Sequence, residues 1–236
     1  MALPKLNNAP NYEMVIPSTK KTVRYRPFLV KEQKALMLAS ESNQPTVMFR
    51  SVLDLLISCI EDKVYEKQLT SFDVEYMFLQ LRAKSVGETA EISIACSECD
   101  HSNGLKINLE DITIEVKDIE KKIDLTDDIK VHLKYPSYLD MINTGVGDGK
   151  EVTAKQSFDI MHSCVEAVET PDEKITMTDV DKKEVEEFID SMNTDQFGKL
   201  QEFISTMPKL DHKVKFKCKQ CEHDNEILVE GISSFL

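Results

Sequence analysis

Two short stretches of the chain carry thiols at a spacing that can bind a metal ion. Each reads Cys-x-x-Cys, an acidic residue and His, at residues 96–101 and 218–223. Alternating apolar residues precede each stretch and an apolar run follows it, so we predict a strand, a thiol-bearing turn and a returning strand at both places. Four thiolates from two such turns are the ligands that a structural zinc ion prefers.

The spacing leaves several arrangements of these thiols open. In the arrangement that we favour, one zinc ion is shared by four cysteines, Cys96, Cys99, Cys218 and Cys221. Two separate sites that use His101 and His223 would each lack a fourth ligand, and redox-active or metal-free thiols are further alternatives. Reactive C-x-x-C pairs usually lie at a helix N-terminus, whereas these lie between predicted strands. We expect both histidines to be polar turn residues outside the ligand set.

The elements that must position these turns are also similar in the two halves of the chain. Residues 53–61 and 158–166 are apolar, helix-length stretches that end in Ser-Cys, an apolar residue and Glu. Further upstream, residues 23–29 and 131–137 are extended basic segments that contain a proline, which favours extended geometry in the preceding residue. A helical stretch follows each of these segments.

We therefore predict an α+β fold built from an internally duplicated unit. Each unit contains a short strand, helices and a β-hairpin with a C-x-x-C knuckle, and the repeats span residues 1–116 and 117–236. We expect the two halves to be joined at a zinc-ribbon-like four-cysteine site. The second repeat carries an acidic insert around residues 167–181, which we predict to be a solvated loop whose last residues cap the following helix.

The helical stretches have patterns typical of a core. Residues 47–60 are apolar on nearly all sides, which predicts a buried central helix. The third helix of each repeat has an apolar stripe that we assign to the core, formed by Phe72, Tyr76 and Leu79 and by Phe197, Leu200, Phe203 and Ile204. Cys59 and Cys164 end the Ser-Cys helices, and we predict that they are buried apolar residues outside the metal site.

The bulk composition indicates a globular protein and argues against several functions. The chain has 236 residues, of which 41% are hydrophobic, and a net charge of −13. This acidic balance argues against general binding of nucleic acid, because phosphate contacts need clustered Lys and Arg. No apolar run is long enough to span a bilayer, and the first ten residues lack a secretory signal, so we expect a protein of a reducing cytoplasm with no membrane contact.

Basic residues gather in two places despite the acidic total. Residues 1–34 hold seven basic against two acidic residues, which could recognise an acidic partner. Near the second thiol turn, one face of the predicted strand carries alternating lysines, Lys213, Lys215, Lys217 and Lys219. We interpret this face as a solvated edge that discourages pairing with other strands.

The sequence contains no recognisable enzyme motif. It has no H-E-x-x-H, and no H-x-E precedes the cysteines as in zinc deaminases. Residues 145–150 are rich in glycine, but Thr144 and Glu151 stand where a phosphate-binding loop needs Gly and Ser or Thr, so we predict a loop there. We therefore expect a protein without catalytic residues.

Several stretches together resemble the baseplate hub assembly family of T4-like bacteriophages. The most specific is Tyr-Arg-Pro-Phe-Leu-Val-Lys-Glu at residues 25–32, and residues 3–6, 16–19 and 57–61 agree with it, as do the two C-x-x-C turns. The resemblance covers most of the chain. It is strongest over residues 3–116 and weak in the acidic insert.

This resemblance implies a non-enzymatic protein of tail morphogenesis that helps to build the baseplate hub. The implied partners are phage baseplate hub proteins, and the implied location is the host cytoplasm, with residence in the virion left open. We expect Arg24, Arg26 and Lys31, with Phe28 as an apolar anchor, to contact a hub component. Alternatively, residues 26–28 only fasten the strand to the first helix. A zinc-ribbon regulator that binds nucleic acid and a thiol oxidoreductase are the competing functions.

Overall fold

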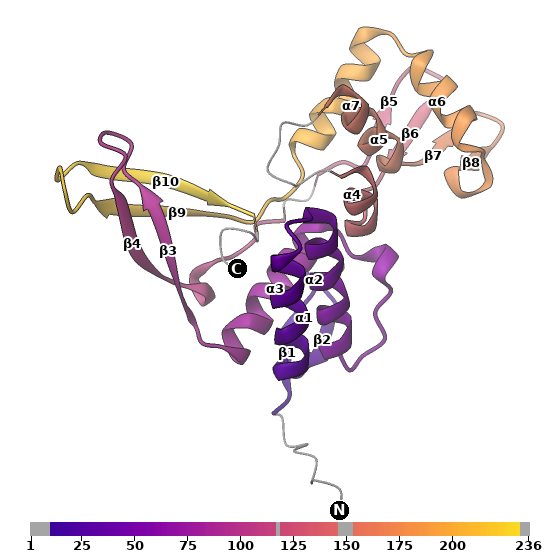
Figure 1. The fold of residues 1–236 in the computed structure, drawn as a ribbon. Coiled ribbons are helices and arrows are strands. Elements are labelled where there is room, and N and C mark those ends of the chain that lie inside the picture. The colour runs from indigo at the N-terminus through magenta and orange to yellow at the C-terminus, as the bar shows by residue number, and fades with distance from the viewer. Residues whose placement is uncertain (1–9, 117–118, 146–152, 232–236) are drawn as a thin grey trace, which may run out of the picture. The chain divides into compact units, whose positions relative to one another are not determined.

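The computed structural model describes residues 10–116, 119–145 and 153–231, and Figure 1 shows its helices and strands. The chain forms two compact units. Unit 1 contains Met1–Tyr65, Phe72–Glu115 and Lys209–Leu236, and unit 2 contains Glu66–Ser71 and Val116–Pro208. Residues 3–6 of the family resemblance and nearly all of the predicted glycine-rich loop lie outside the described residues.

Unit 1 begins with a short hairpin and three helices. Strands β1 (Tyr12–Val15) and β2 (Thr22–Tyr25) pair antiparallel, and α1 (Val30–Glu41), α2 (Pro45–Cys59) and α3 (Ser71–Ser85) follow. The proline that opens α2 suits a first turn, where no N–H bond is lost. The predicted burial of α2 is confirmed for its C-terminal half, which includes Val52, Leu53, Leu55 and Leu56. Phe72 and Leu79 of α3 are also buried, as their stripe predicted.

Unit 1 also contains the two predicted thiol hairpins. Strand β3 (Thr89–Ala95) pairs with β4 (Ser102–Asn108), and β9 (Asp211–Lys217) pairs with β10 (Asp224–Glu230). The two hairpins lie side by side, with their thiol turns at the same end (Figure 1). At the other end, close to the 3₁₀ turn η2 (Leu109–Asp111), apolar residues of both hairpins and of α3 form one buried cluster, Leu79, Ala83, Ala90, Ile107, Leu109, Ile112, Leu210, Val214 and Val229.

In its described residues, unit 2 contains an antiparallel sheet and four helices. The strand order is β5 (Lys122–Asp124), β6 (Lys130–Leu133), β7 (Val165–Glu169) and β8 (Lys174–Thr176). The helices are α4 (Tyr138–Thr144), α5 (Ala154–Cys164), α6 (Lys182–Asp190) and α7 (Thr194–Ser205), and the unit also has 3₁₀ turns η1 (Glu66–Gln68) and η3 (Met177–Asp179). Capping boxes at Ser137, Thr153 and Asn193 fix where α4, α5 and α7 begin.

The acidic insert differs from its prediction. We expected a solvated loop around residues 167–181, but residues 167–169 belong to β7, residues 174–176 form β8 and residues 177–179 form η3. Ala167 and Val168 are buried, and their pairing with His132 and Val131 adds β7 to the sheet beside β6. Helix α6 then starts after Asp181, which occupies the N-cap position as predicted but makes no side-chain capping hydrogen bond. Leu200 and Phe203 of α7 are buried, as their stripe predicted.

The two Ser-Cys helices end in the same way within their own units. In unit 1 the main-chain N–H of Arg26 donates to the carbonyl of Cys59 (3.0 Å), and in unit 2 that of Lys134 donates to the carbonyl of Cys164 (2.8 Å). Both cysteines are buried, as predicted. Burial raises the pKa of both thiols, that of Cys164 to about 12, so both are neutral apolar groups.

The compact units divide the chain differently from the predicted repeats. Lys209–Leu236, which includes the second C-x-x-C hairpin, belongs to unit 1 together with the first hairpin. The four cysteines therefore lie within one unit, whereas we expected them to join two separate halves. The repeat boundary near residue 116 rests on sequence similarity and stays a prediction. No helix among the residues described is long and apolar enough to cross a membrane.

Candidate metal centre

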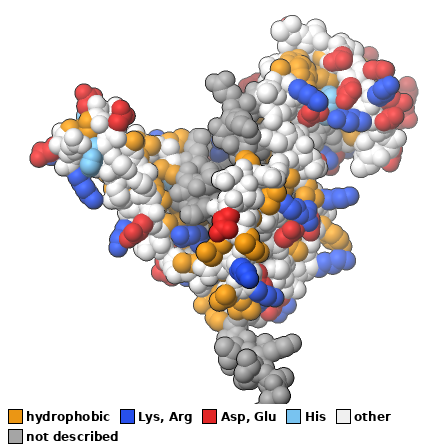
Figure 2. Space-filling view, viewed as in Figure 1, with side chains coloured by type: hydrophobic (Ala, Val, Ile, Leu, Met, Phe, Trp, Pro, Cys, Tyr) orange, Lys and Arg blue, Asp and Glu red, His pale blue; other side chains and the backbone are white. Residues whose placement is uncertain are grey.

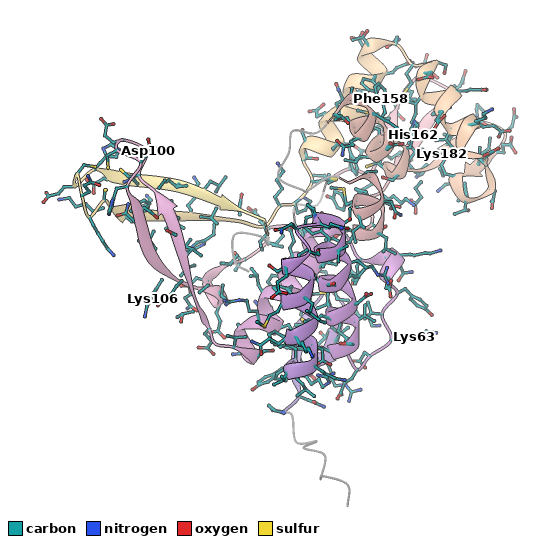
Figure 3. All side chains as sticks on the ribbon, viewed as in Figure 1. Lys63, Asp100, Lys106, Phe158, His162 and Lys182 are labelled. Atoms are coloured by element: carbon teal, nitrogen blue, oxygen red, sulfur yellow. The ribbon has the colours of Figure 1, made fainter. Side chains whose placement is uncertain are left out.

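Each C-x-x-C turn has the same main-chain geometry. The first cysteine of each turn donates its N–H to the carbonyl of the histidine five residues later, at 2.9 Å in both cases. Its own carbonyl accepts from the acidic residue that follows the second cysteine. That acidic residue has a left-handed backbone, with φ of +55° at Asp100 and +60° at Glu222. This sharp reversal directs the two thiols of each turn to the same side. Figure 3 labels Asp100 at the end of its hairpin.

The four predicted cysteines come together between the two hairpins. The sulfur of Cys96 lies 3.6 Å from that of Cys221, and the sulfur of Cys99 lies 3.7 Å from that of Cys218. All four sulfurs lie within 4.8 Å of one another. These distances are too long for a disulfide, which needs about 2.05 Å. They match the edge of a zinc–thiolate tetrahedron, which is about 3.8 Å long when Zn–S is about 2.3 Å.

The first cysteine of each turn is more buried than the second. Cys96 and Cys218 are buried, Cys99 is partly exposed and Cys221 is exposed. Burial of this kind would disfavour thiolates unless N–H groups donated to them. Main-chain N–H groups within the same turn do donate to the sulfurs of the first cysteines, for example from Gln220 to Cys218 at 3.4 Å.

The thiols divide into two classes by the direction of their pKa shifts. Burial raises the pKa of Cys96, but N–H donors from its own turn and from Asn225 outweigh burial and lower it. The main-chain N–H of Cys221 contributes most to lowering the pKa of Cys218 to about 6. N–H donors also lower the pKa of Cys99 and Cys221, but burial and the thiols of Cys96 and Cys218 raise both, that of Cys99 to about 12. Neighbouring thiols thus oppose ionisation of Cys99 and Cys221, and a dication bound among the four sulfurs would remove that opposition.

The histidines and the other cysteines lie outside this cluster. Among the described residues, the cysteines of the two turns are the group of side chains placed to hold a metal ion, and His101 and His223 are not part of it. The main-chain N–H of each histidine donates to the sulfur of the second cysteine of its turn. Cys59 and Cys164 lie at their helix ends, as described above.

Sequence reasoning missed two asparagines that contact the cluster. Asn103 and Asn225 are buried and their side-chain amides donate to the sulfurs of Cys218 and Cys96. A signal for them was present in the sequence. The two turns also agree at the second residue beyond the histidine, so that the shared pattern is C-x-x-C, an acidic residue, His, any residue and Asn.

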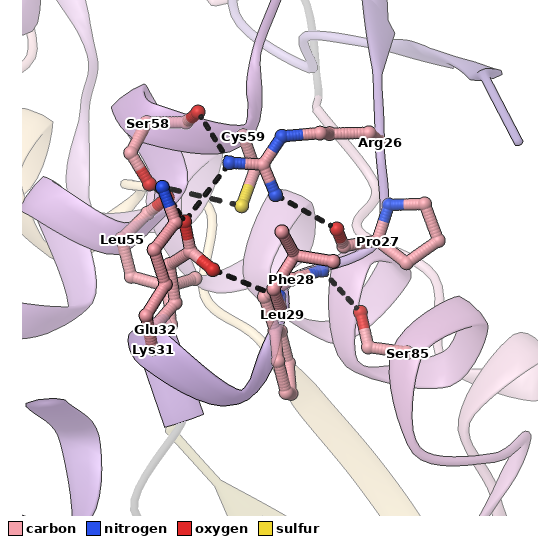
Figure 4. Close-up of polar contacts among 10 residues, drawn as sticks. All are labelled: Arg26, Pro27, Phe28, Leu29, Lys31, Glu32, Leu55, Ser58, Cys59 and Ser85. Carbon is pink, nitrogen blue, oxygen red and sulfur yellow. Dashed lines mark hydrogen bonds and ion pairs between the residues drawn. The ribbon is translucent and has the colours of Figure 1, made fainter. Parts of the chain in front are cut away.

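Two of the predicted partner-binding residues are engaged within unit 1. Arg24 forms an ion pair with Asp62 (3.1 Å), and Arg26 forms one with the buried Glu32 (2.9 Å). The guanidinium of Arg26 also donates to the carbonyls of Pro27 and Ser58 (Figure 4). Arg26 therefore fastens strand β2 to the helices, which is the alternative role that the sequence left open.

The other two predicted partner-binding residues differ in exposure. Phe28 is partly buried, and its main-chain N–H donates to the hydroxyl of Ser85 (3.0 Å) (Figure 4). Lys31 is 71% exposed and lies 3.2 Å from Glu32. Of the four residues, Lys31 is thus the one whose side chain is most accessible to a partner.

Comparison with known proteins assigns the chain to a family. No solved structure matches it. The baseplate hub assembly protein gp26 of Enterobacteria phage T4 is 21% identical over 232 residues, which cover 95% of this chain and 97% of that protein. A family described as T4 bacteriophage base plate protein matches residues 9–236, which is nearly the whole chain. The chain therefore belongs to the family of T4 bacteriophage base plate proteins.

Proposed function

We propose that this chain is a non-enzymatic protein of phage tail morphogenesis that acts in assembly of the baseplate hub through protein–protein contacts and is stabilised by zinc. The family assignment and the name of the T4 relative support the role in the hub. The observation that carries the structural part is the convergence of four thiols from segments more than 100 residues apart. We propose action in the infected host cell, and association with the tail of the virion follows from the family.

Zinc is the metal that fits the four-cysteine cluster best. The ligands are all thiolates, their spacing fits a tetrahedron, and zinc and iron are the common metals of such sites. All four positions of the tetrahedron would be filled by protein, which is the closed arrangement of structural zinc. In this role the ion would tie β9 and β10 to β3 and β4 within unit 1.

We further propose that the chain arose by duplication of one unit. The same order of elements occurs twice: a hairpin, a helix, the Ser-Cys helix, a third helix and a thiol hairpin. The first copy is β1–β2, α1, α2, α3 and β3–β4, and the second is β5–β6, α4, α5, α7 and β9–β10. The matching bonds to the carbonyls of Cys59 and Cys164 support the proposal. Strands β7 and β8 and helix α6 would be the later insert.

The outer face of α1 is the surface that we propose for contact with a hub protein. Among the residues described, five of the ten exposed large apolar side chains lie between residues 29 and 47, so the apolar surface is concentrated there, at Leu29, Val30, Met37, Leu38 and Val47. Figure 2 shows apolar side chains mixed with Lys and Arg over these helices. Lys31 and Lys34 are exposed beside them, which favours an acidic amphipathic segment as partner.

Binding of nucleic acid has less support. The lysines of β9 that could meet phosphate face carboxylates instead, because Lys213 and Lys215 lie within 3.9 Å and 3.2 Å of Glu226. Lys217 is likewise 3.2 Å from Glu222. Each phosphate contact would therefore require breaking an ion pair within the protein.

One experiment tests both parts of the proposal. The tagged chain is expressed in phage-infected cells and purified, its bound metal is measured, and co-purified proteins are identified. We expect about one zinc per chain and recovery of baseplate hub proteins. The variant Met37→Glu/Leu38→Glu should lose the hub proteins and keep the zinc, and Leu228→Glu, which changes an exposed leucine of β10, should keep both.

Four results would contradict the proposal. A metal-free chain would refute the zinc site. Bound iron would refute the choice of zinc as the metal of that site. Retention of hub proteins by the Met37→Glu/Leu38→Glu variant would exclude the α1 face as their contact. A chain that is dimeric by light scattering and becomes monomeric in this variant would assign the face to self-association.

A further inference from the structure

The two buried asparagines occupy equivalent positions in the two thiol hairpins. Asn103 is the second residue of β4 and Asn225 is the second residue of β10. Each follows the second cysteine of its own turn by four residues. Their exposed fractions are 0% and 4%, which is low for an amide side chain at the end of a two-stranded hairpin. A buried amide is costly unless its donors and its acceptor all have partners.

Asn225 connects its own hairpin to the turn of the other one. Its side-chain oxygen accepts from the main-chain N–H and from the hydroxyl of Ser97, both at 2.9 Å. Its side-chain nitrogen donates to the carbonyl of His223 in its own turn (3.0 Å) and to the sulfur of Cys96 in the opposite turn (3.5 Å). All hydrogen-bonding groups of this amide therefore have partners.

Asn103 makes the reciprocal set of bonds. Its oxygen accepts from the main-chain N–H of Lys219 (3.0 Å), and its nitrogen donates to the carbonyl of His101 (2.8 Å) and to the sulfur of Cys218 (3.7 Å). The sulfurs that receive these amides are those of the two buried cysteines. The exposed side of the cluster, formed by Cys99 and Cys221, receives no asparagine bond in the described structure.

We propose that Asn103 and Asn225 are positioning residues of the metal centre, each of which holds the buried thiolate of the opposite hairpin. This inference rests on the proposed zinc site. An N–H bond to a thiolate is charge-assisted, so it stabilises the ionised sulfur that zinc requires. Because each amide oxygen also accepts a hydrogen bond from the main chain of the opposite turn, it fixes the distance between the two turns. Partners of metal ligands that act in this way contribute about 10- to 100-fold to metal affinity.

The test compares zinc binding by variants of the purified full chain. In Asn103→Ala and Asn225→Ala all the bonds of one amide are lost. In Asn103→Asp and Asn225→Asp the side chain keeps its shape and the acceptor for the opposite main-chain N–H, but an oxygen replaces the N–H donor to sulfur. The matched control is Asn108→Ala, which changes an exposed asparagine at the far end of β4 that caps η2.

Zinc affinity is measured by competition with a chromophoric chelator, and the sulfur-to-cobalt charge-transfer band is recorded after Co²⁺ replaces zinc. Each Ala and Asp variant should bind zinc about 10- to 100-fold more weakly than the wild type. The charge-transfer band should shift in all four variants, because loss of an N–H bond changes the electron density on sulfur. Asn108→Ala should match the wild type in both measurements.

The outcomes separate this inference from the zinc proposal. If the wild-type chain binds neither zinc nor cobalt, the zinc site itself is refuted and the inference falls with it. If the wild type binds zinc and the Asp variants keep its affinity within twofold and its cobalt band, only the role of the asparagines is refuted. Variants that unfold more readily but keep the cobalt band would likewise assign the asparagines a purely structural role. Circular dichroism identifies any Ala variant that fails to fold, and the isosteric Asp variants then decide.

Discussion

The two ends of the paired thiol hairpins are held together by different physical means. At the turn end, four sulfurs and two buried amides form a polar cluster. At the opposite end, Ala90 and Ile107 of one hairpin and Val214 and Val229 of the other pack with Leu109 in a cluster of buried apolar side chains. Between the ends, the inward side chains are only partly buried, among them Ile92, Ile94, Leu105 and Phe216.

This contrast leads us to expect that one end depends on the proposed metal. The end opposite the turns, which we call the base, buries apolar area against α3. Each fully buried Leu or Ile there contributes roughly 1.5–3 kcal/mol to the stability of the fold. The turn end has little apolar area to bury, and neighbouring thiols oppose the ionisation of Cys99 and Cys221. We therefore expect the base to fold from its apolar contacts, and the turn end to become ordered when zinc binds. The predictions below separate these two contributions.

The largest effect is expected from loss of a metal ligand. Replacing any of the four clustered cysteines by Ser, as in Cys96→Ser or Cys218→Ser, should abolish zinc binding and remove up to about 10 kcal/mol of metal-linked folding energy from the turn end. Hydrogen exchange should show faster exchange of amides near both turns, while β3 and β9 near the base stay protected. Zinc content and exchange are measured on the same samples.

The control for this change uses the cysteines outside the cluster. Cys59→Ala and Cys164→Ala remove buried thiols at the ends of α2 and α5, so they should keep the full zinc content. Their cost should be limited to about 1–2 kcal/mol from lost packing. Loss of zinc in either of these variants, or retention of zinc after Cys218→Ser, would contradict the assignment of the metal centre.

The next effect concerns the base of the hairpins. Leu109 is 0% exposed in the apolar cluster, so Leu109→Ala should lower the free energy of unfolding of unit 1 by about 2–5 kcal/mol. Leu228→Ala is the matched control, since this leucine of β10 is largely outside the cluster, and it should cost less than about 1 kcal/mol. Urea unfolding of the zinc-loaded protein measures both.

Zinc content distinguishes the two ends in the same experiment. We expect folded Leu109→Ala to keep one zinc per chain, because the thiol turns do not touch this residue. If Leu109→Ala lowered zinc affinity as strongly as the loss of Asn103 or Asn225, the two ends would be coupled. The claim that they are stabilised by separate means would then be wrong.

The difference between the two ends also explains how much the sequence could predict. The thiol turns, their flanking strands and the choice of Cys96, Cys99, Cys218 and Cys221 follow from local spacing, and the structure brings these sulfurs together. The assignment of both hairpins to one unit depends on the distant packing of Leu210, Val214 and Val229 against residues of α3, which no local pattern encodes. The predicted meeting of the cysteines was therefore correct. The two repeats that they were expected to join stay a proposal, because the compact units assign both hairpins to unit 1.

Two other differences have similar physical causes. Asn103 and Asn225 were not predicted because an asparagine after a turn is usually exposed, and their role depends on contacts that cross between hairpins. The strands of the acidic insert were missed because only a few apolar residues, such as Val168, mark them, and pairing with β6 decides their conformation. Residues 26–28 were correctly given two alternatives, because charge alone does not show whether Arg26 has a partner inside the protein.

An intermediate effect is expected from a carboxyl group near the base. Burial raises the pKa of Glu75 in α3 from 4.5 to about 7, although the main-chain N–H of Leu210 opposes this shift. Between pH 4.5 and about 7 the folded protein keeps a proton that the unfolded chain releases, so this group lowers stability as the pH rises through that range. At pH 8, Glu75→Gln should therefore be more stable than the wild type by on the order of 2–3 kcal/mol.

The pH dependence separates this effect from zinc binding. Below pH 4.5 the carboxyl is protonated in both states, so the advantage of Glu75→Gln should disappear there. Urea unfolding of both proteins at matched pH cancels the contribution of the metal, which is the same in each. An equal gain at pH 5 and pH 8 would show that Gln improves packing, and that ionisation of Glu75 is not the cause.

The smallest effect is expected on the outer face of the second hairpin. Lys215 lies 3.2 Å from Glu226, but the side chains are 73% and 52% exposed, so solvent and salt screen the pair. Lys215→Ala and Glu226→Gln should each change the free energy of unfolding by less than about 0.5 kcal/mol, with no change in zinc content. A cost above 1 kcal/mol in low salt that vanishes at high salt would show that these charges help to hold β9 and β10 together. The outer face would then contribute to their stability, in addition to the metal at one end and the apolar cluster at the other.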